Sequence, residues 1–233
     1  TGFDADPMRT TQYEIGFRQQ IGENAAIDIS GFYKNIIGQT QVQRVVAEPG
    51  AQSTTFYTIG NGDFATTKGV EIRLTLRRIE RLQAQLNYTL SSAEGTGSNE
   101  TAYYSASYNG TAIPTITSPL DYNQTHRGSV LLDYRFGPND GGPVLQNLGA
   151  NLIFSFSSGH AFTYSIAAAG GQADPYTAGT DYMIDTRTRE AAETIGSSTT
   201  PWNFNMDMRL DKSFTIYDKL MATVYVRVNN LLN

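Results

Sequence analysis

The sequence predicts an all-β protein: an antiparallel transmembrane β-barrel, of which this chain supplies a part, about eight strands of a larger barrel. Three observations support this fold class. Long segments alternate between apolar and polar residues, as expected of strands with two different faces. Each of these segments has ten or more residues, enough for the ~9–11 of a bilayer-crossing strand, whereas strands of soluble domains usually have about 5–6 residues. The connections between them alternate between short and long.

The alternation is clearest at residues 69–90, "GVEIRLTLRRIERLQAQLNYTL", where Val70 and Ile72 alternate with Glu71 and Arg73. After a short break the same pattern resumes, which predicts a hairpin with one apolar face and one charged face. Eight segments of this kind are predicted as strands: Thr10–Ile21, Ala25–Ile36, Tyr57–Arg78, Leu82–Ser92, Thr125–Phe136, Leu148–Ser158, Trp202–Phe214 and Leu220–Asn229.

The predicted connections differ in length in a regular way. The short ones contain "GENA", "RIER", "GPNDGGPVLQN" and "TIYDK", and the long ones cover residues 37–56, 93–124 and 159–201. Outer-membrane barrels have short periplasmic turns and long extracellular loops. We therefore expect the long loops outside the cell and the short turns in the periplasm. Because the first connection is short, we also expect both chain ends outside, with at least one final strand missing.

The composition narrows the class of protein. The net charge is −5 and basic residues form no cluster, which argues against a nucleic-acid partner. The chain contains no cysteine, which excludes disulfides and thiolate metal sites. Mean hydropathy is −0.34, and no apolar run approaches the ~18 residues of a membrane helix. Transmembrane strands remain possible, because only every second residue of such a strand is apolar.

Full charges recur on one side of the predicted strands. On the lipid side, an arginine near the bilayer midplane costs about 2–4 kcal/mol, whereas a water-filled lumen accepts it at little cost. A soluble β-sandwich with one charged outer face stays open as an alternative. The charged residues expected to face the lumen are Glu14, Arg18, Asp28, Glu71, Arg73, Arg77, Asp133, Arg135, Asp207, Arg209 and Arg227.

Aromatic residues gather toward both ends of the apolar side, as two interfacial girdles would require. Phe136 and Phe214 belong to the periplasmic ends of their strands, and the others lie toward the extracellular ends. The aromatic residues expected to face lipid are Tyr33, Tyr88, Phe136, Phe154, Phe156, Trp202, Phe204 and Phe214.

The sequence offers little catalytic or metal-binding chemistry. The two histidines, His126 and His160, have no acidic residue at metal-ligand spacing, so we interpret them as isolated polar residues at loop margins. No nucleophile-elbow motif is present. Carboxylates that could be imagined as glycosidase pairs have arginines two residues away, which favours lumenal ion pairs. We predict no catalytic residue, no metal site and no cofactor.

The long loops are the best candidates for contact with a ligand, because they are rich in tyrosine and small polar residues. The same tyrosines could instead pack the loops onto one another. A short helix is expected near Thr188–Thr194, ended by Gly196. The candidate ligand-contacting residues are Tyr103, Tyr104, Tyr108, Tyr122, Tyr176 and Tyr182.

Several stretches together span nearly the whole chain and resemble the C-terminal half of the barrel in TonB-dependent outer-membrane receptors. The likeness is greatest to the Oar-like branch, whose members carry a carboxypeptidase-regulatory-like domain. Departures include Thr125 before His126, Ala161 in "SSGHAFT", and "NLLN" at the end. The stretches, in chain order, are "RTTQYEIGFRQQIGENAAIDISGFYKNI", "TKGVEIRLTLRR", "NYTLSSAEGTGS", "SPLDYNQTH", "NMDMRLDKSF" and "VRVNNLLN".

The resemblance implies that residues 1–233 are the C-terminal portion of a receptor barrel, with the plug domain, Ton box and early strands elsewhere. It implies contact with outer-membrane lipid, with the rest of the barrel and plug, with the TonB complex and with an unknown nutrient. The expected function is TonB-energised uptake of a bulky nutrient. A non-transporting barrel, such as an adhesin or a surface-assembly component, and a soluble β-sandwich binding module remain alternatives.

Overall fold

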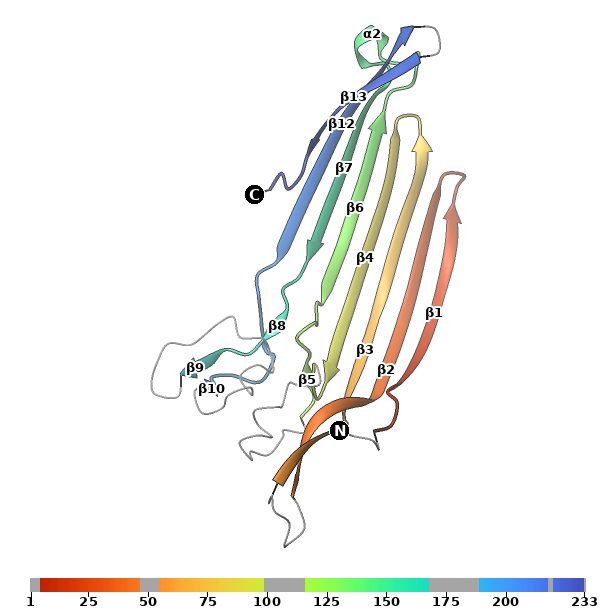
Figure 1. Ribbon diagram of the computed structural model, residues 1–233. Helices are drawn as coiled ribbons and strands as arrows, with labels where there is room; N and C mark the ends of the chain where they lie inside the picture. The colour runs from red at the N-terminus through yellow and green to blue at the C-terminus, as the bar shows by residue number, and fades with distance from the viewer. Residues whose placement is uncertain (1–4, 47–54, 99–115, 168–188, 218–219, 233) are drawn as a thin grey trace.

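The computed structural model describes residues 5–46, 55–98, 116–167, 189–217 and 220–232. Their main feature is one antiparallel sheet in the order β1-β2-β3-β4-β6-β7-β12-β13, with β5 added beside β4 (Figure 1). The path strands are β1 (Arg9–Ile21), β2 (Ala25–Val46), β3 (Thr55–Ile79), β4 (Leu82–Gly95), β6 (His126–Arg135), β7 (Leu148–Ser157), β12 (Asn203–Tyr217) and β13 (Leu220–Val228).

Each strand pairs with its neighbour along the path, so the sheet is a meander whose order follows the chain. The eight predicted strands are confirmed, with ends that differ by a few residues except in the β2–β3 hairpin. The turns β1–β2 and β3–β4 and the connection β6–β7 all lie at the same end of the sheet, which we call the turn end (Figure 1). We call the opposite end the loop end.

The remaining elements are short. Helix α2 (Gly142–Leu145) lies at the turn end, in the connection between β6 and β7. At the loop end, β8 (Ala161–Phe162) pairs with β11 (Ser198–Thr199), and β9 (Ser165–Ala167) pairs with β10 (Arg189–Ala191). β5 (Ser118–Pro119) completes the set. The helix expected near Thr188–Thr194 is wrong, because part of that segment pairs as β10.

The hairpin of β2 and β3 is longer than expected. Residues 37–46 had been assigned to a long loop, but they pair with β3 back to Thr55. The register shifts beside Gly38, whose φ is +72°, so that the hairpin continues through a bulge. Glycine and a run of polar residues indicated a loop from the sequence, whereas the cross-strand pairing makes the segment a strand.

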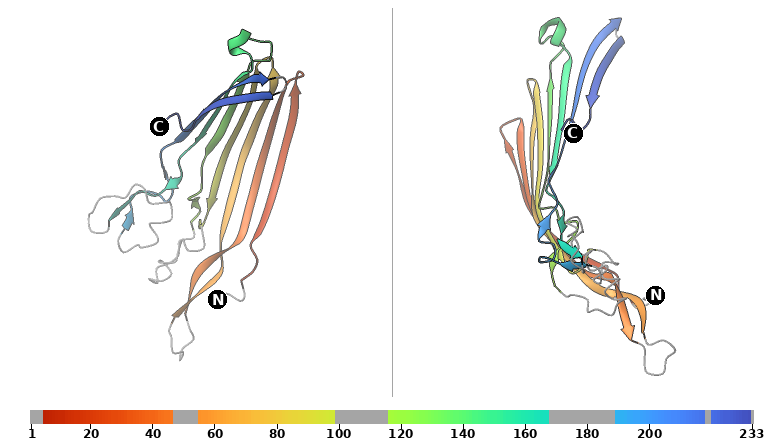
Figure 2. Two further views of the ribbon diagram at one scale, coloured as in Figure 1. Left: turned by 45° about the horizontal axis from the view of Figure 1, so that its top comes forward. Right: turned by 90° about the vertical axis from the view of Figure 1, so that its left-hand side faces the viewer.

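The sheet is a single curved layer, as the edge-on view in Figure 2 shows. Its small hydrophobic cluster consists of Ala65, Ala93 and Leu120, with Ile36 against it, where the segment after β4 folds back on the sheet. Within the described residues, no second sheet covers the large sheet, so the β-sandwich alternative is wrong for this part of the chain. The strands at the two edges, β1 and β13, pair on one side only. The barrel is therefore not closed by these residues.

Candidate functional site: the polar face of the sheet

The register of the strands divides the large sheet into two faces. Residues directly opposite one another on paired antiparallel strands point to the same side. One row across the sheet runs through Asp28, Arg73, Asn87, Ser129, Ser155 and Asn205. The adjacent row on the other side runs through Phe17, Ile29, Ile72, Tyr88, Gly128, Phe156 and Phe204. We call these sides the polar face and the apolar face.

The charged residues predicted to lie together do share a face. All of them fall on the polar face by register except Arg77, which lies in a register shift between Leu76 and Ile79. That shift also brings Arg78 to the polar face, where it forms an ion pair with Asp133. Strict alternation misses Arg78, because a bulge places two consecutive residues opposite one partner residue.

The predicted aromatic residues lie on the opposite side. Trp202 precedes β12 and stacks against Phe204 and His126, with ring centroids 6.0 and 5.4 Å away. Phe136 follows β6 and meets Tyr134 edge to face at 5.5 Å. The remaining predicted aromatic residues, Tyr33, Tyr88, Phe154, Phe156, Phe204 and Phe214, are on the apolar face by register.

Ion pairs concentrate on the polar face near the turn end. Arg135 Nη1 and Nη2 donate to the two carboxylate oxygens of Asp211, at 2.8 and 3.1 Å. Arg135 also lies 3.8 Å from Asp133, and Arg209 lies 3.8 Å from Asp211. Bidentate hydrogen bonds of this kind hold both partners in a fixed orientation. Asp211 was not among the predicted residues, although it continues the alternation through Asp207 and Arg209.

Gly149 makes the Arg135–Asp211 pair possible. It lies between the two residues in the same row, on β7. A β-carbon added to Gly149 would come within 2.6 Å of the Arg135 guanidinium carbon. The arginine side chain therefore crosses β7 through space that only glycine leaves free. Close approach is a common reason for glycine in the interior of a strand.

A further ion pair, between Arg81 and Asp140, joins two turns at the turn end. Arg81, between β3 and β4, donates through Nε to Asp140 at 2.6 Å, and its guanidinium carbon lies 4.6 Å above the Phe136 ring. The hydrogen bond from Arg81 lowers the pKa of the Asp140 carboxyl below its ordinary value, with further contributions from its charge and from backbone N–H groups. This pair joins two turns that are distant in the sequence.

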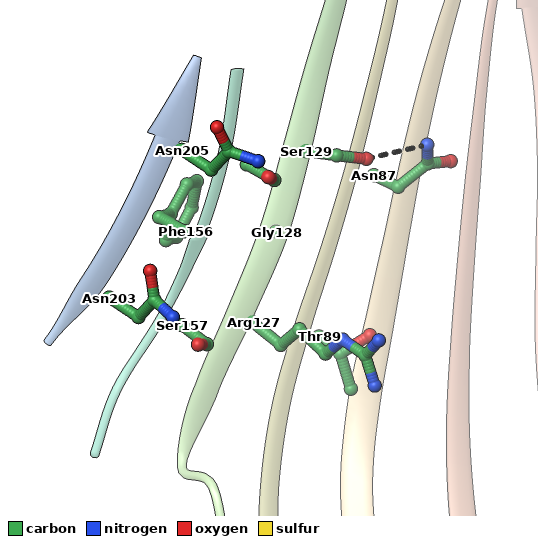
Figure 3. A pocket seen from close by; sticks show the side chains of 10 residues that line it. Asn87, Thr89, Arg127, Gly128, Ser129, Phe156, Ser157, Asn203 and Asn205 are labelled. Carbon is green, nitrogen blue, oxygen red and sulfur yellow. Dashed lines mark hydrogen bonds between the residues drawn. The ribbon is translucent and has the colours of Figure 1, made fainter. Parts of the chain in front are cut away.

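A different environment occupies the loop end of the polar face. A hollow of about 430 Å³ lies over β4, β6, β7 and β12 (Figure 3). Arg127 extends from β6 toward Thr89 on β4, on the side away from Asn203 and Asn205, and Asn87 Nδ2 donates to Ser129 Oγ at 3.3 Å. We call this space the Arg127 hollow. Its lining residues are Asn87, Thr89, Arg127, Gly128, Ser129, Ser155, Phe156, Ser157, Asn203 and Asn205.

A second hollow, of about 630 Å³, adjoins the first and shares Asn87 and Thr89 with it. It covers β1 to β4 and contains charges of both signs. Arg18 pairs with Asp28, and Arg73 Nε donates to Asn87 Oδ1 at 3.2 Å. The charged residues that line it are Glu14, Arg18, Asp28, Glu71 and Arg73.

Only one of the predicted ligand-contacting tyrosines can be placed. Tyr122 lies at the loop end with 47% of its surface exposed, and burial of the rest, together with the charge of Asp121, raises the pKa of its phenol. Neither hollow contains it. The others, Tyr103, Tyr104, Tyr108, Tyr176 and Tyr182, lie outside the described residues.

The histidines have local partners. His126 Nδ1 and the Tyr88 hydroxyl form a hydrogen bond of 2.8 Å, and Gln124 Nε2 donates to His160 Nε2 at 3.1 Å. Among the described residues, no group of three or more His, Cys, Asp or Glu side chains could hold a metal ion. No helix in the described part of the chain has both the length and the apolar character to span a membrane.

A family model described as "TonB dependent receptor-like, beta-barrel" matches residues 2–231. The chain belongs to this family. Its members are outer-membrane receptors and transporters, so the predicted family and the barrel-type sheet are both confirmed. The match concerns the family as a whole, and the Oar-like branch remains a prediction. A search of curated proteins found no match.

Solved structures with a similar fold include the following three. The outer membrane transporter YddB from Escherichia coli is 14% identical with a TM-score of 0.64, over 98% of this chain and 29% of its own. FpvA of P. aeruginosa, bound to heterologous pyoverdines, is 14% identical with a TM-score of 0.55, over 97% and 24%. The FrpB iron transporter from Neisseria meningitidis is 19% identical with a TM-score of 0.56, over 99% and 28%. The chain thus spans less than a third of each.

Proposed function

We propose that this chain forms part of the wall of an outer-membrane barrel that takes up a bulky nutrient with energy delivered through TonB. In this proposal the apolar face meets lipid, and the polar face lines the lumen. The remaining wall and a plug domain come from parts of the protein outside this chain. The protein binds and passes its ligand rather than converting it.

The observation that carries the proposal is the uncovered apolar face. Ile15 on β1 is 82% exposed, and Leu74 on β3 and Val226 on β13 are also exposed, with no layer packed over them in the described residues. An apolar surface that extends across a whole sheet is unstable in water, since monomeric soluble proteins rarely expose apolar patches above a few hundred Å². Contact with lipid removes the free-energy cost of exposing this apolar face to water.

The other face supports the same assignment. Ion pairs and amide side chains on it need water or polar partners, because burying unpaired charges in a dry interior costs several kcal/mol each. A water-filled lumen satisfies them. The asymmetry of the connections supports extracellular loops at the loop end and periplasmic turns at the turn end, as is usual for outer-membrane barrels.

The two faces can be tested with one matched pair of substitutions in the full-length protein. Leu74→Arg places a charge on the apolar face of β3, where lipid contact near the bilayer midplane would make it cost about 2–4 kcal/mol. Thr75→Arg places the same charge one residue later on the polar face. We expect Leu74→Arg to lower the amount of folded barrel in the outer membrane strongly and Thr75→Arg to leave it nearly unchanged. Equal effects would overturn the assignment of the faces.

Transport needs a separate test. Cells that carry the full-length protein should grow on, or accumulate, its nutrient only when the inner-membrane energising complex is intact. Binding at the cell surface without energy-dependent uptake would instead indicate a receptor or adhesin that does not transport. In that outcome the barrel assignment would survive and the TonB-coupled function would not.

A further inference from the structure

Arg127 is the starting point, because its guanidinium has no ionic partner among the residues that the structure describes. Its row on the polar face runs from Arg127 on β6 through Thr89 on β4 to Glu71 on β3. No ion pair joins Arg127 to any residue that the structure describes, Glu71 included. Thr89 lies between Arg127 and Glu71 in this row, and its side chain is on the same face.

The surroundings of Arg127 are rich in neutral hydrogen-bonding groups. Around it the Arg127 hollow offers three asparagine amides and four hydroxyl groups, and none of its described lining residues is a carboxylate. The acidic side chains of this part of the face belong to the adjoining hollow. An arginine in such a setting favours an oxyanion, which it can bind through two parallel N–H···O bonds. The surrounding amides and hydroxyls favour neighbouring hydroxyl or carbonyl groups on the same ligand.

The position of the hollow suits an incoming ligand. Its residues come from the first positions of β6 and β12, from the last positions of β7, all toward the loop end, and from the middle of β4 (Figures 1 and 3). At about 430 Å³ it falls within the usual range of small-molecule sites, roughly 300–1,000 Å³. A sugar-acid-sized group fits this volume, as a free solute or as one arm of something larger.

We propose that the Arg127 hollow binds a carboxylate that is flanked by hydroxyl groups, as in a sugar acid or hydroxy acid. This inference rests on the proposed function for its biological meaning, since it names the chemical class that the receptor recognises on its polar face. Arg127 holds the carboxylate. Asn87, Asn203 and Asn205 bond to the flanking hydroxyls.

The test uses purified full-length protein in detergent and two probes of matched shape, gluconate and its uncharged relative sorbitol. Saturation-transfer NMR titrations measure the affinity of each probe. We expect gluconate to bind wild type at least tenfold more tightly than sorbitol, and Arg127→Gln to remove that difference. Arg227→Gln, which removes an arginine from the polar face at a distance from the hollow, should keep it. Heat-modifiable migration on gels verifies that each variant is folded.

Equal affinity for the two probes, or gluconate binding that survives Arg127→Gln, would overturn the inference. So would an absence of gluconate binding to wild type, as would follow if a carboxylate from the plug already occupied Arg127. The titration requires neither transport nor an energised membrane. Failure of uptake with preserved gluconate binding therefore refutes the proposed function alone, and the converse result refutes only this site.

Discussion

Two rows of the polar face contain the same three-strand arrangement and behave differently. Near the turn end, Arg135 and Asp211 flank Gly149, and the two charges meet in a two-pronged ion pair. Near the loop end, Arg127 and Glu71 flank Thr89, and within the described residues no ion pair forms between them. Both rows separate an arginine and an acid by one intervening strand.

The difference lies in the middle residue. Gly149 leaves open the space through which the guanidinium passes, whereas Thr89 has a side chain on the same face. Ion pairs at the turn end are therefore used to hold strands together. In our proposal, Arg127 in the other row remains available to a ligand. The following predictions test this contrast, from the largest expected effect to the smallest.

Removal of the acidic residue should lower the free energy of unfolding strongly in the Arg135–Asp211 row and only slightly in the Arg127–Glu71 row. Asp211→Ala leaves Arg135 without its main partner, and because the Asp211 side chain is only 7% exposed, we expect a loss of about 2 kcal/mol. Glu71→Ala removes an acid that forms no ion pair with any described residue, and we expect a change within about 0.5 kcal/mol. Urea unfolding of the full-length protein in detergent measures both. Similar losses would show that the pairing does not distinguish the rows.

A side chain at position 149 should disrupt the Arg135–Asp211 ion pair, because Gly149 lies between these two residues. Gly149→Ala forces the Arg135 guanidinium aside, and we expect a net loss of about 1 kcal/mol, reduced by the better strand propensity of alanine. The matched control is Gly31→Ala, whose new β-carbon would have its nearest contact at 3.9 Å. In the Asp211→Ala background, Gly149→Ala should cost nothing. Additive losses in this double-mutant cycle would contradict the role of Gly149.

Removing the side chain of Thr89 should allow Arg127 and Glu71 to form an ion pair like that of Arg135 and Asp211. Thr89→Gly removes the side chain between Arg127 and Glu71, so their new ion pair should compete with an added anion. We expect gluconate to bind a few-fold more weakly, with a stability change below about 1 kcal/mol, because an exposed pair contributes little. Thr89→Ser retains the β-carbon and should bind gluconate as wild type does. Unchanged binding in Thr89→Gly would separate ligand affinity from the geometry of the row.

The ion pair between Arg81 and Asp140 should lose its contribution to stability only in acid. Because Arg81 lowers the pKa of Asp140 in the folded state, the pair stabilises the fold at any pH above the ordinary value of about 3.9. That contribution is lost as the pH falls from there through the lower folded-state pKa. Thermal unfolding of wild type and Asp140→Asn should differ by a constant amount between pH 7 and pH 5 and converge in stronger acid. Convergence already at pH 6 would argue against this role of the ion pair.

Much of this sheet could be predicted from the sequence, and the misses are specific. Alternation is a local property, so it was enough to place Glu71 and Arg73 opposite Val70 and Ile72. It failed at Arg78, where a bulge shifts the pattern, and at residues 37–46, where polar composition resembled a loop. The Arg127 hollow was missed because its asparagines, serines and threonine look like ordinary polar positions until the strands are aligned.

The sequence by itself determined the eight long strands, the face on which most of their side chains lie and the alternation of short and long connections, because backbone geometry repeats every two residues. Tertiary structure alone decided which residues meet across strands. Register is set by pairing with distant segments, and it placed Gly149 between Arg135 and Asp211 but Thr89 between Arg127 and Glu71. A difference of one side chain in the middle of a row thus separates a structural ion pair from an arginine that has no ion pair among the described residues, and no local pattern contains that information.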